Sequence, residues 1–172
     1  MENRSSEKRL ELWELPPEVK ELVAECELTG RRTVFHRGER AVAILVSHDE
    51  YLALRETIDI AADAALLARI AAAEEEIRRG AMLLSEDLGM ARGNDRLRMA
   101  AAVEKEWTSL SAEEQTLVRA AMVAIDDDPI IGAPLFDPMR GLWSYRAGHL
   151  RIVYRVVAEA RFIAVFAIVR AA

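Results

Sequence analysis

The chain has 172 residues, 52% of them hydrophobic and 30% charged, which is the balance of a soluble globular protein with one or two small domains. No apolar run approaches the roughly 20 residues that cross a bilayer, and no apolar signal core follows the N-terminus. We therefore expect a cytoplasmic protein with no membrane partner. The single cysteine, Cys26, excludes an intrachain disulfide and a cysteine-rich metal site. We expect neither a metal nor a cofactor.

The net charge of −6 is unevenly distributed along the chain. Residues 1–89 hold 12 basic and 19 acidic side chains, whereas residues 90–172 hold 11 basic and 10 acidic ones. From Arg140 to the end there are six arginines and one acid, Glu159. An acidic first half joined to a basic second half predicts a contact between the two within the chain. The alternative is that this uneven distribution of charge arose by chance in a short sequence.

Residues 15–60 predict a small mixed unit. Pro16 and Pro17 suit the start of a helix, and Gly30 suits its end. Residues 33–36 and 41–46 predict two strands joined by a turn at 37–39. Ser47 and Glu50 form the pattern of a capping box, which predicts a further helix.

An alanine-rich helix is predicted over residues 63–79. Asp63 is a good N-cap and Gly80 suits a left-handed stop. This helix has little apolar mass of its own, so we expect it to need a partner surface. A short capped turn is predicted at 85–88, and the small, polar residues 89–93 predict a domain boundary.

The remaining residues predict a strand at 97–100, helices at 101–110 and 112–125, and three strands at 142–146, 150–157 and 161–169. Ser111 and Glu114 form another capping box between the helices. This order predicts an α+β fold, in which a helical hairpin packs on an antiparallel sheet. The last hairpin turns at 147–149 and carries three arginines interleaved with aromatic residues, which suits a phosphate backbone with stacked bases.

Both halves of the chain resemble known families. Residues 15–88 resemble Phd/YefM-type antitoxins through the first helix, Thr33-Val-Phe, the Arg37-Gly38 turn, residues 41–47 and His48-Asp-Glu-Tyr51. Residues 94–170 resemble the RelE/ParE toxins. The matching segments are 97–100, 103–107, 110–114, Asp128-Pro129, Arg140-Gly141 and 146–154.

The resemblance implies a division of labour. It implies an antitoxin domain at 1–88, with a folded DNA-binding and dimerisation part at 15–60 and a toxin-wrapping tail at 61–88. A linker at 89–93 and a toxin domain at 94–172 follow. The implied function is a type II toxin–antitoxin fusion, in which the antitoxin half neutralises a ribosome-dependent mRNA interferase, an endoribonuclease, and represses its own operator. The implied partners are the chain's other half, a second copy through the antitoxin half, operator DNA, the ribosome and mRNA.

The same resemblance implies the site residues. For operator DNA they are Arg31, Arg32, Arg37 and Arg40, and the alternative is that these are solvated arginines beside Glu25, Glu27 and Glu39. For catalysis they are Arg146, Arg151 and Arg170. For RNA binding they are Arg140, Tyr145, Tyr154 and Arg155.

Several residues depart from the pattern of an active nuclease. Leu142 and Ser144 stand where RelE carries lysines, and no tyrosine follows Arg170, so the sequence identifies no general acid. His149 is a candidate base, and the alternative is an ordinary exposed turn histidine. These departures keep two other interpretations open: a catalytically inactive or ParE-like, gyrase-targeting fusion that acts as a binding module, and an unrelated α+β interaction domain.

Overall fold

The computed structural model describes residues 8–84, 96–158 and 161–171. The predicted capped turn at 85–88 and the predicted linker at 89–93 lie outside these residues. The chain divides into two compact units, Met1–Tyr51 and Leu52–Ala172. This division falls earlier than the predicted linker, because the helices that follow residue 52 pack on the sheet of the second unit.

In its described residues, from 8 onward, the first unit contains a short 3₁₀ turn, η1 (Leu12–Glu14), a helix, a hairpin and the start of a second helix. Helix α1 (Pro17–Thr29) begins at the predicted proline and ends at Gly30, whose φ of +68° is the left-handed conformation that stops a helix. Strands β1 (Thr33–Arg37) and β2 (Arg40–Leu45) pair antiparallel, as predicted, with an irregularity at Phe35/His36.

The first unit has almost no core of its own. Cys26 is its only buried residue in the part of the chain that the structure describes. The hairpin exposes large apolar side chains, and a two-stranded hairpin is marginal by itself in water. These side chains are Val34, Phe35, Val42 and Ile44.

Helix α2 (His48–Ala62) begins in the first unit and continues into the second. The Ser47 hydroxyl accepts a hydrogen bond from the Glu50 amide at 3.1 Å, as the capping box predicts. The reciprocal half of the box does not form. The Glu50 carboxylate pairs with the Arg32 guanidinium instead, because that charged partner lies within reach.

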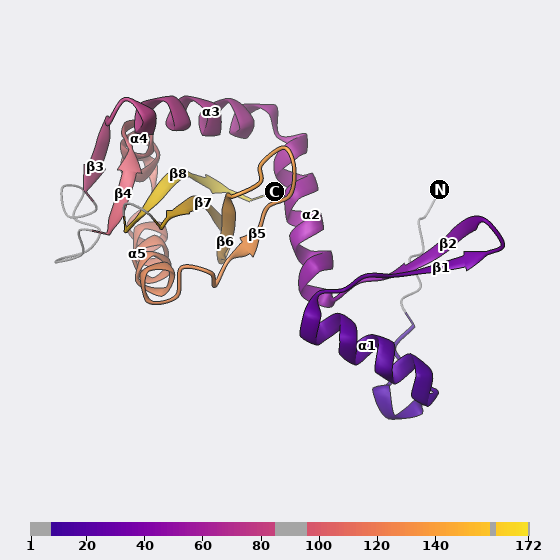
Figure 1. The fold of residues 1–172 in the computed structure, drawn as a ribbon. Coiled ribbons are helices and arrows are strands. Elements are labelled where there is room, and N and C mark those ends of the chain that lie inside the picture. Colours follow the sequence, from indigo (N-terminus) through magenta and orange to yellow (C-terminus); the bar gives the residue numbers. More distant parts are fainter. Residues whose placement is uncertain (1–7, 85–95, 159–160, 172) are drawn as a thin grey trace, which may run out of the picture. The chain divides into compact units, whose positions relative to one another are not determined.

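Helix α3 (Ala64–Arg78) begins at the predicted cap, where the Asp63 carboxylate accepts the Leu66 amide at 2.9 Å. Its buried residues Leu66, Ile70 and Ala73 belong to the core of the second unit. Strand β3 (Met82–Leu84) follows and adds to the edge of the sheet. Figure 1 shows α3 running beside the sheet, between α2 and β3.

Within residues 52–84, 96–158 and 161–171, the sheet of the second unit has six strands in the order β3-β4-β8-β7-β6-β5. The α+β class agrees with the prediction, but the sheet is mixed rather than antiparallel, because β4 and β8 pair in parallel. The remaining neighbours pair antiparallel. The strands not yet bounded are β4 (Leu97–Ala100), β5 (Ala133–Pro134), β6 (Trp143–Ala147), β7 (Leu150–Val157) and β8 (Phe162–Arg170).

Helices α4 (Ala101–Ser109) and α5 (Ala112–Asp127) form the predicted hairpin. The capping box between them is complete, with Ser111 accepting the Glu114 amide and Glu114 accepting the Ser111 amide. Val103, Val118 and Met122 from these helices join the apolar residues of β7 and β8 in one core. No helix in the described residues is both long and apolar enough to span a bilayer.

The register of β6 and β7 determines which side chains share a face of the sheet. Arg146 is opposite Arg151, and Ser144 is opposite Val153, so these side chains project to one face. Tyr145 and Ile152 alternate with them and project to the other. We call the first of these the arginine face.

Candidate functional site

Two arginines stand side by side on the arginine face. Arg146 of β6 and Arg151 of β7 are direct cross-strand partners next to the tight turn at Gly148, whose φ is +64°. The side chain of Arg151 is 5% exposed, whereas that of Arg146 is 44% exposed. One guanidinium is therefore buried within the fold and the other is partly open to solvent.

A single carboxylate from α2 joins both arginines to Ser144. Glu56 Oε1 accepts from Arg151 Nε at 2.6 Å and from the Ser144 hydroxyl at 2.5 Å, and Oε2 accepts from Arg146 Nε at 2.9 Å. Glu56, Ser144 and Arg151 are all buried. Burial alone raises the pKa of Glu56, but the bonds from Ser144, Arg151 and Arg146 outweigh it and hold this pKa below its ordinary value. We call this group the Glu56 cluster.

A second carboxylate on the same helix face reinforces the contact. Asp59 lies three residues after Glu56, so the two side chains are neighbours on α2. Its Oδ2 is 3.2 Å from Arg146 Nη2 and 3.7 Å from Arg151 Nη2. The Asp59 side chain is about half exposed. Two acids of α2 thus face the two arginines of the sheet.

Thr57 and Ile60 also join α2 to the rest of the sheet unit. The Thr57 hydroxyl accepts a hydrogen bond from the Phe136 amide at 3.1 Å, and Ile60 is fully buried. Helix α3 is attached differently, through the apolar residues Leu66 and Ile70 and through polar contacts at its other end. In those contacts Glu74 pairs with Arg155 at 3.0 Å, and Glu76 accepts the Ala102 amide at 3.0 Å.

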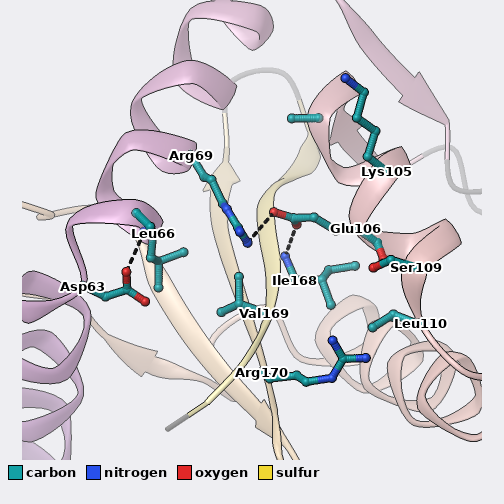
Figure 2. Close-up of a pocket in the computed structure, with 12 residues that line it drawn as sticks. Asp63, Leu66, Arg69, Lys105, Glu106, Ser109, Leu110, Ile168, Val169 and Arg170 are labelled. Carbon is teal, nitrogen blue, oxygen red and sulfur yellow. Dashed lines mark hydrogen bonds and ion pairs between the residues drawn. The ribbon is translucent and has the colours of Figure 1, made fainter.

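A groove lies between α3 and α4 above the outer edge of β8. Figure 2 shows Arg69 reaching from α3 toward Glu106 of α4, which accepts the Ile168 amide at 2.6 Å. Strand β4 ends before this point, so the Glu106 carboxylate occupies the place of a neighbouring strand. Burial raises the pKa of Glu106. The groove has a volume of about 590 Å³.

Arg170 does not join the other two catalytic candidates. It is opposite Leu150 in the β7–β8 pair, so it lies on the opposite face to Arg151. Its guanidinium makes two bonds of 2.8 Å to Glu114 at the start of α5. His149 Nε2 is 3.0 Å from the same carboxylate. The bonds from Arg170, His149 and the Ser111 amide hold the pKa of Glu114 well below its usual range.

The four predicted RNA-binding residues are scattered. Tyr154 is fully buried, and its hydroxyl donates to the Pro129 carbonyl at 3.0 Å and accepts the Gly132 amide at 3.2 Å. Burial raises the pKa of Tyr154 to about 12. It is a core residue here and presents no ring for stacking. Tyr145 is half-buried on the opposite face, Arg155 pairs with Glu74, and Arg140 is exposed beside Asp137.

The four predicted DNA-binding arginines fall into two pairs. Arg31 pairs with Glu25 and Arg32 pairs with Glu50. Arg37 and Arg40 are cross-strand partners at the tip of the β1–β2 hairpin, and both are exposed. The structure therefore separates two arginines that neighbouring acids neutralise from two that project at a hairpin tip.

Sequence reasoning missed the residues that cover the arginines. Glu56 and Asp59 were not identified, and Ser144 was noted only as a departure from a lysine. The one available signal is the spacing of two acids by three residues on a predicted helix in the acidic half of the chain. This signal is weak, because most such acids are solvated.

Comparisons with known proteins give structural neighbours only. No protein-family model matches the sequence, and no curated protein matches it either. Among solved structures, the RelBE2 toxin–antitoxin complex of Mycobacterium tuberculosis is similar at 21% identity and a TM-score of 0.41, over 43% of this chain and 94% of that one. The intact Escherichia coli RelBE complex is similar at 23% and 0.39, over 44% and 95%. The isolated Escherichia coli RelE toxin is similar at 22% and 0.40, over 44% and 83%.

Proposed function

We propose that this chain is a self-neutralised toxin–antitoxin fusion. Residues 94–172 are a RelE-like endoribonuclease domain directed at mRNA on the ribosome, and the preceding helices are its inhibitor. The observation that carries the proposal is the Glu56 cluster, in which an acid from the antitoxin-like half holds both arginines that the sequence resemblance identifies as catalytic. Arg146 and Arg151 would neutralise the charge that develops on the scissile phosphate.

The inhibition follows from the chemistry of the cluster. Carboxylate and phosphate oxygens both accept charge-assisted hydrogen bonds from a guanidinium, so Glu56 and an RNA phosphate compete for the same donors. Glu56 has the advantage of belonging to the same chain. A short tether gives an effective concentration on the order of millimolar, which free RNA does not reach.

The two inhibitor helices have different parts in this proposal. Helix α3 buries Leu66, Ile70 and Ala73 in the core, which supports a role as a lasting anchor. Helix α2 places one large apolar side chain, Ile60, in the core. It reaches the arginines through Glu56 and Asp59, which supports a role as their cover. In this view α2 can be separated from the site while α3 stays in place.

The first unit is proposed to dimerise and to bind operator DNA. Its small core and exposed apolar hairpin support pairing with a second copy. Arg37 and Arg40 support a DNA contact at the hairpin tip, whereas Arg31 and Arg32 are already paired with acids. In gel shifts at low salt with upstream DNA, Arg37→Ala should weaken binding and Arg31→Ala should not. Equal effects would remove the hairpin tip from the proposal.

Growth is the test of the toxin half. Residues 94–172 expressed alone should arrest bacterial growth and cause mRNA cleavage, and the full chain should do neither. Arg151→Ala in the fragment should relieve the arrest, because it removes the buried guanidinium of the proposed site. A harmless fragment with normal expression would end the nuclease proposal.

A second candidate is a fusion that binds but does not cleave. It is favoured by the residues around the arginines. Leu142 and Ser144 are buried, Arg170 is held by Glu114, and no acid–base group among the described residues touches the pair apart from Glu56 and Asp59 of the cover. Growth arrest without mRNA cleavage would favour a ParE-like target, gyrase. No arrest combined with operator binding would favour a pure binding module.

A further inference from the structure

A cavity of about 430 Å³ lies beside the exposed side of the Glu56 cluster. Its wall includes the apolar side chains of Leu52 and Ile131. The polar and charged residues of the wall are Arg55, Glu56, Asp59, Ser144 and Arg146. Leu52 and Ile131 are each 44% exposed, so they keep apolar surface available at the cavity. The volume and the mixture of apolar walls with a few polar groups are those of a small-molecule site.

Arg146 retains binding capacity in this cavity. Its Nε and Nη2 atoms bond to Glu56 and Asp59, and in the described part of the chain its Nη1 has no hydrogen-bond partner. The Asp59 carboxylate that shares Nη2 is half exposed and can turn into solvent. Arg151 differs because its guanidinium is buried under Glu56. Of the two arginines of the Glu56 cluster, Arg146 is therefore the one that can receive an anion while the cover remains in place.

The loop that forms the opposite wall is held close to the sheet. A Cβ added at Gly132 would lie 2.7 Å from the Tyr154 hydroxyl and 2.8 Å from the Ser144 carbonyl, so the glycine permits this approach. The neighbouring Ile131 thereby lines the same cavity as Arg146. An anion-binding group and apolar walls are thus brought within the span of one small molecule.

We propose that this cavity binds a nucleoside monophosphate in the intact chain, with the phosphate on Arg146 and the base between the apolar walls. A flat, weakly polar ring suits Leu52 and Ile131. A dianionic phosphate suits the side of the Arg146 guanidinium where Glu56 does not bind Nη1 and where the second carboxylate, Asp59, is exposed. The proposal rests on the proposed function only in treating Arg146 as a phosphate-binding residue. It requires neither release of α2 nor cleavage of RNA.

The test is isothermal titration calorimetry of the full-length protein with adenosine 5′-monophosphate, adenosine and inorganic phosphate. The nucleotide should bind at least tenfold more tightly than either of its halves. Arg146→Gln should weaken nucleotide binding at least tenfold. Asp59→Asn should tighten it by about twofold to fivefold, because it removes an exposed competitor for the guanidinium. Arg78→Gln is the control, since it removes one equal charge from the exposed end of α3.

Three results would overturn the proposal. They are no binding of the nucleotide to either the wild-type or the Asp59→Asn protein, phosphate binding as tight as nucleotide binding, and an Arg146→Gln protein that binds like the wild type. The gain expected of Asp59→Asn cannot arise from misfolding, which keeps the test decisive if Arg146→Gln proves unstable. Toxicity of residues 94–172 is measured separately, so failure of one proposal is distinguishable from failure of the other.

Discussion

Replacing Glu56 with alanine removes the acceptor that three side chains share. Arg151 is the residue most affected, because its side chain is 5% exposed and Glu56 is its nearest carboxylate. Removing one partner of a buried ion pair costs about 3–5 kcal/mol. Asp59, whose Oδ2 lies 3.7 Å from Arg151 Nη2, offers partial compensation. Arg146 is nearly half exposed, so the loss of its ion pair with Glu56 adds no more than about 1 kcal/mol. We therefore expect Glu56→Ala to lower the free energy of unfolding by about 3 kcal/mol, the lower end of the range for a buried ion pair.

The assay is urea unfolding of the full-length protein at neutral pH, followed by tryptophan fluorescence. Glu75→Ala is the matched control, because it removes a carboxylate that pairs with Arg78 and Arg79 on the exposed side of α3. The control should lower the free energy of unfolding by less than about 1 kcal/mol.

A double variant isolates the cause of the loss. Glu56→Leu combined with Arg151→Met replaces both charges by apolar groups and should recover most of the stability that Glu56→Ala loses, because no buried charge is left unpaired. If Glu56→Ala unfolds within about 1 kcal/mol of the wild type, the Glu56 cluster is not the buried ion pair described above.

Three further predictions concern titration and the core. Because the pKa of Glu56 is lowered in the folded chain, its stabilisation is present above about pH 4.5 and is lost as the pH falls through the folded pKa; acid unfolding should be shallower in Glu56→Gln, and equal slopes would contradict this. The pKa of Glu106 is raised, so its charged form opposes folding at pH 8, and Glu106→Gln should be at least as stable as the wild type there, with any advantage vanishing toward pH 4. A clear loss at pH 8 would count against this reasoning. Tyr154→Phe removes the hydroxyl bonds to Pro129 and Gly132 and should cost about 1–3 kcal/mol in urea unfolding, whereas an unchanged midpoint would show that these bonds contribute nothing.

The sequence predicted best those helix ends that depend on residues close by in the chain. The start of α1 is set by the fixed φ of proline, and its end by the left-handed conformation of Gly30. Asp63 before α3 and the Ser111 capping box each act through one or two nearby hydrogen bonds. The structure contains all four. Strand β3 was missed, because three residues are too few to show a periodicity.

Long-range competition explains the remaining differences. Glu50 turns from its own helix start to Arg32, and β4 pairs parallel to β8, which no local pattern encodes. Arg170 shares a sheet with Arg151 but not a face, because strand alternation directs it to Glu114. A row of arginines in sequence is therefore not a row in space.

Long-range contacts also limited the prediction of the candidate site. Arg146 and Arg151 could be predicted as a cross-strand pair from the tight turn between them. Glu56 and Asp59 could not, because their partners lie about 90 residues further along the chain. An acid on a helix acquires a specific role only when the fold places a cation opposite it.

The measurement that tests the central claim most directly is neutralisation between separate chains. Residues 94–172 should arrest growth, and co-expression of residues 1–88 should restore it. Residues 1–88 with Glu56→Ala and Asp59→Ala should fail to restore growth while still co-purifying with residues 94–172, since α3 retains its apolar contacts. Full rescue by the double variant would contradict the claim that these two carboxylates cover the site.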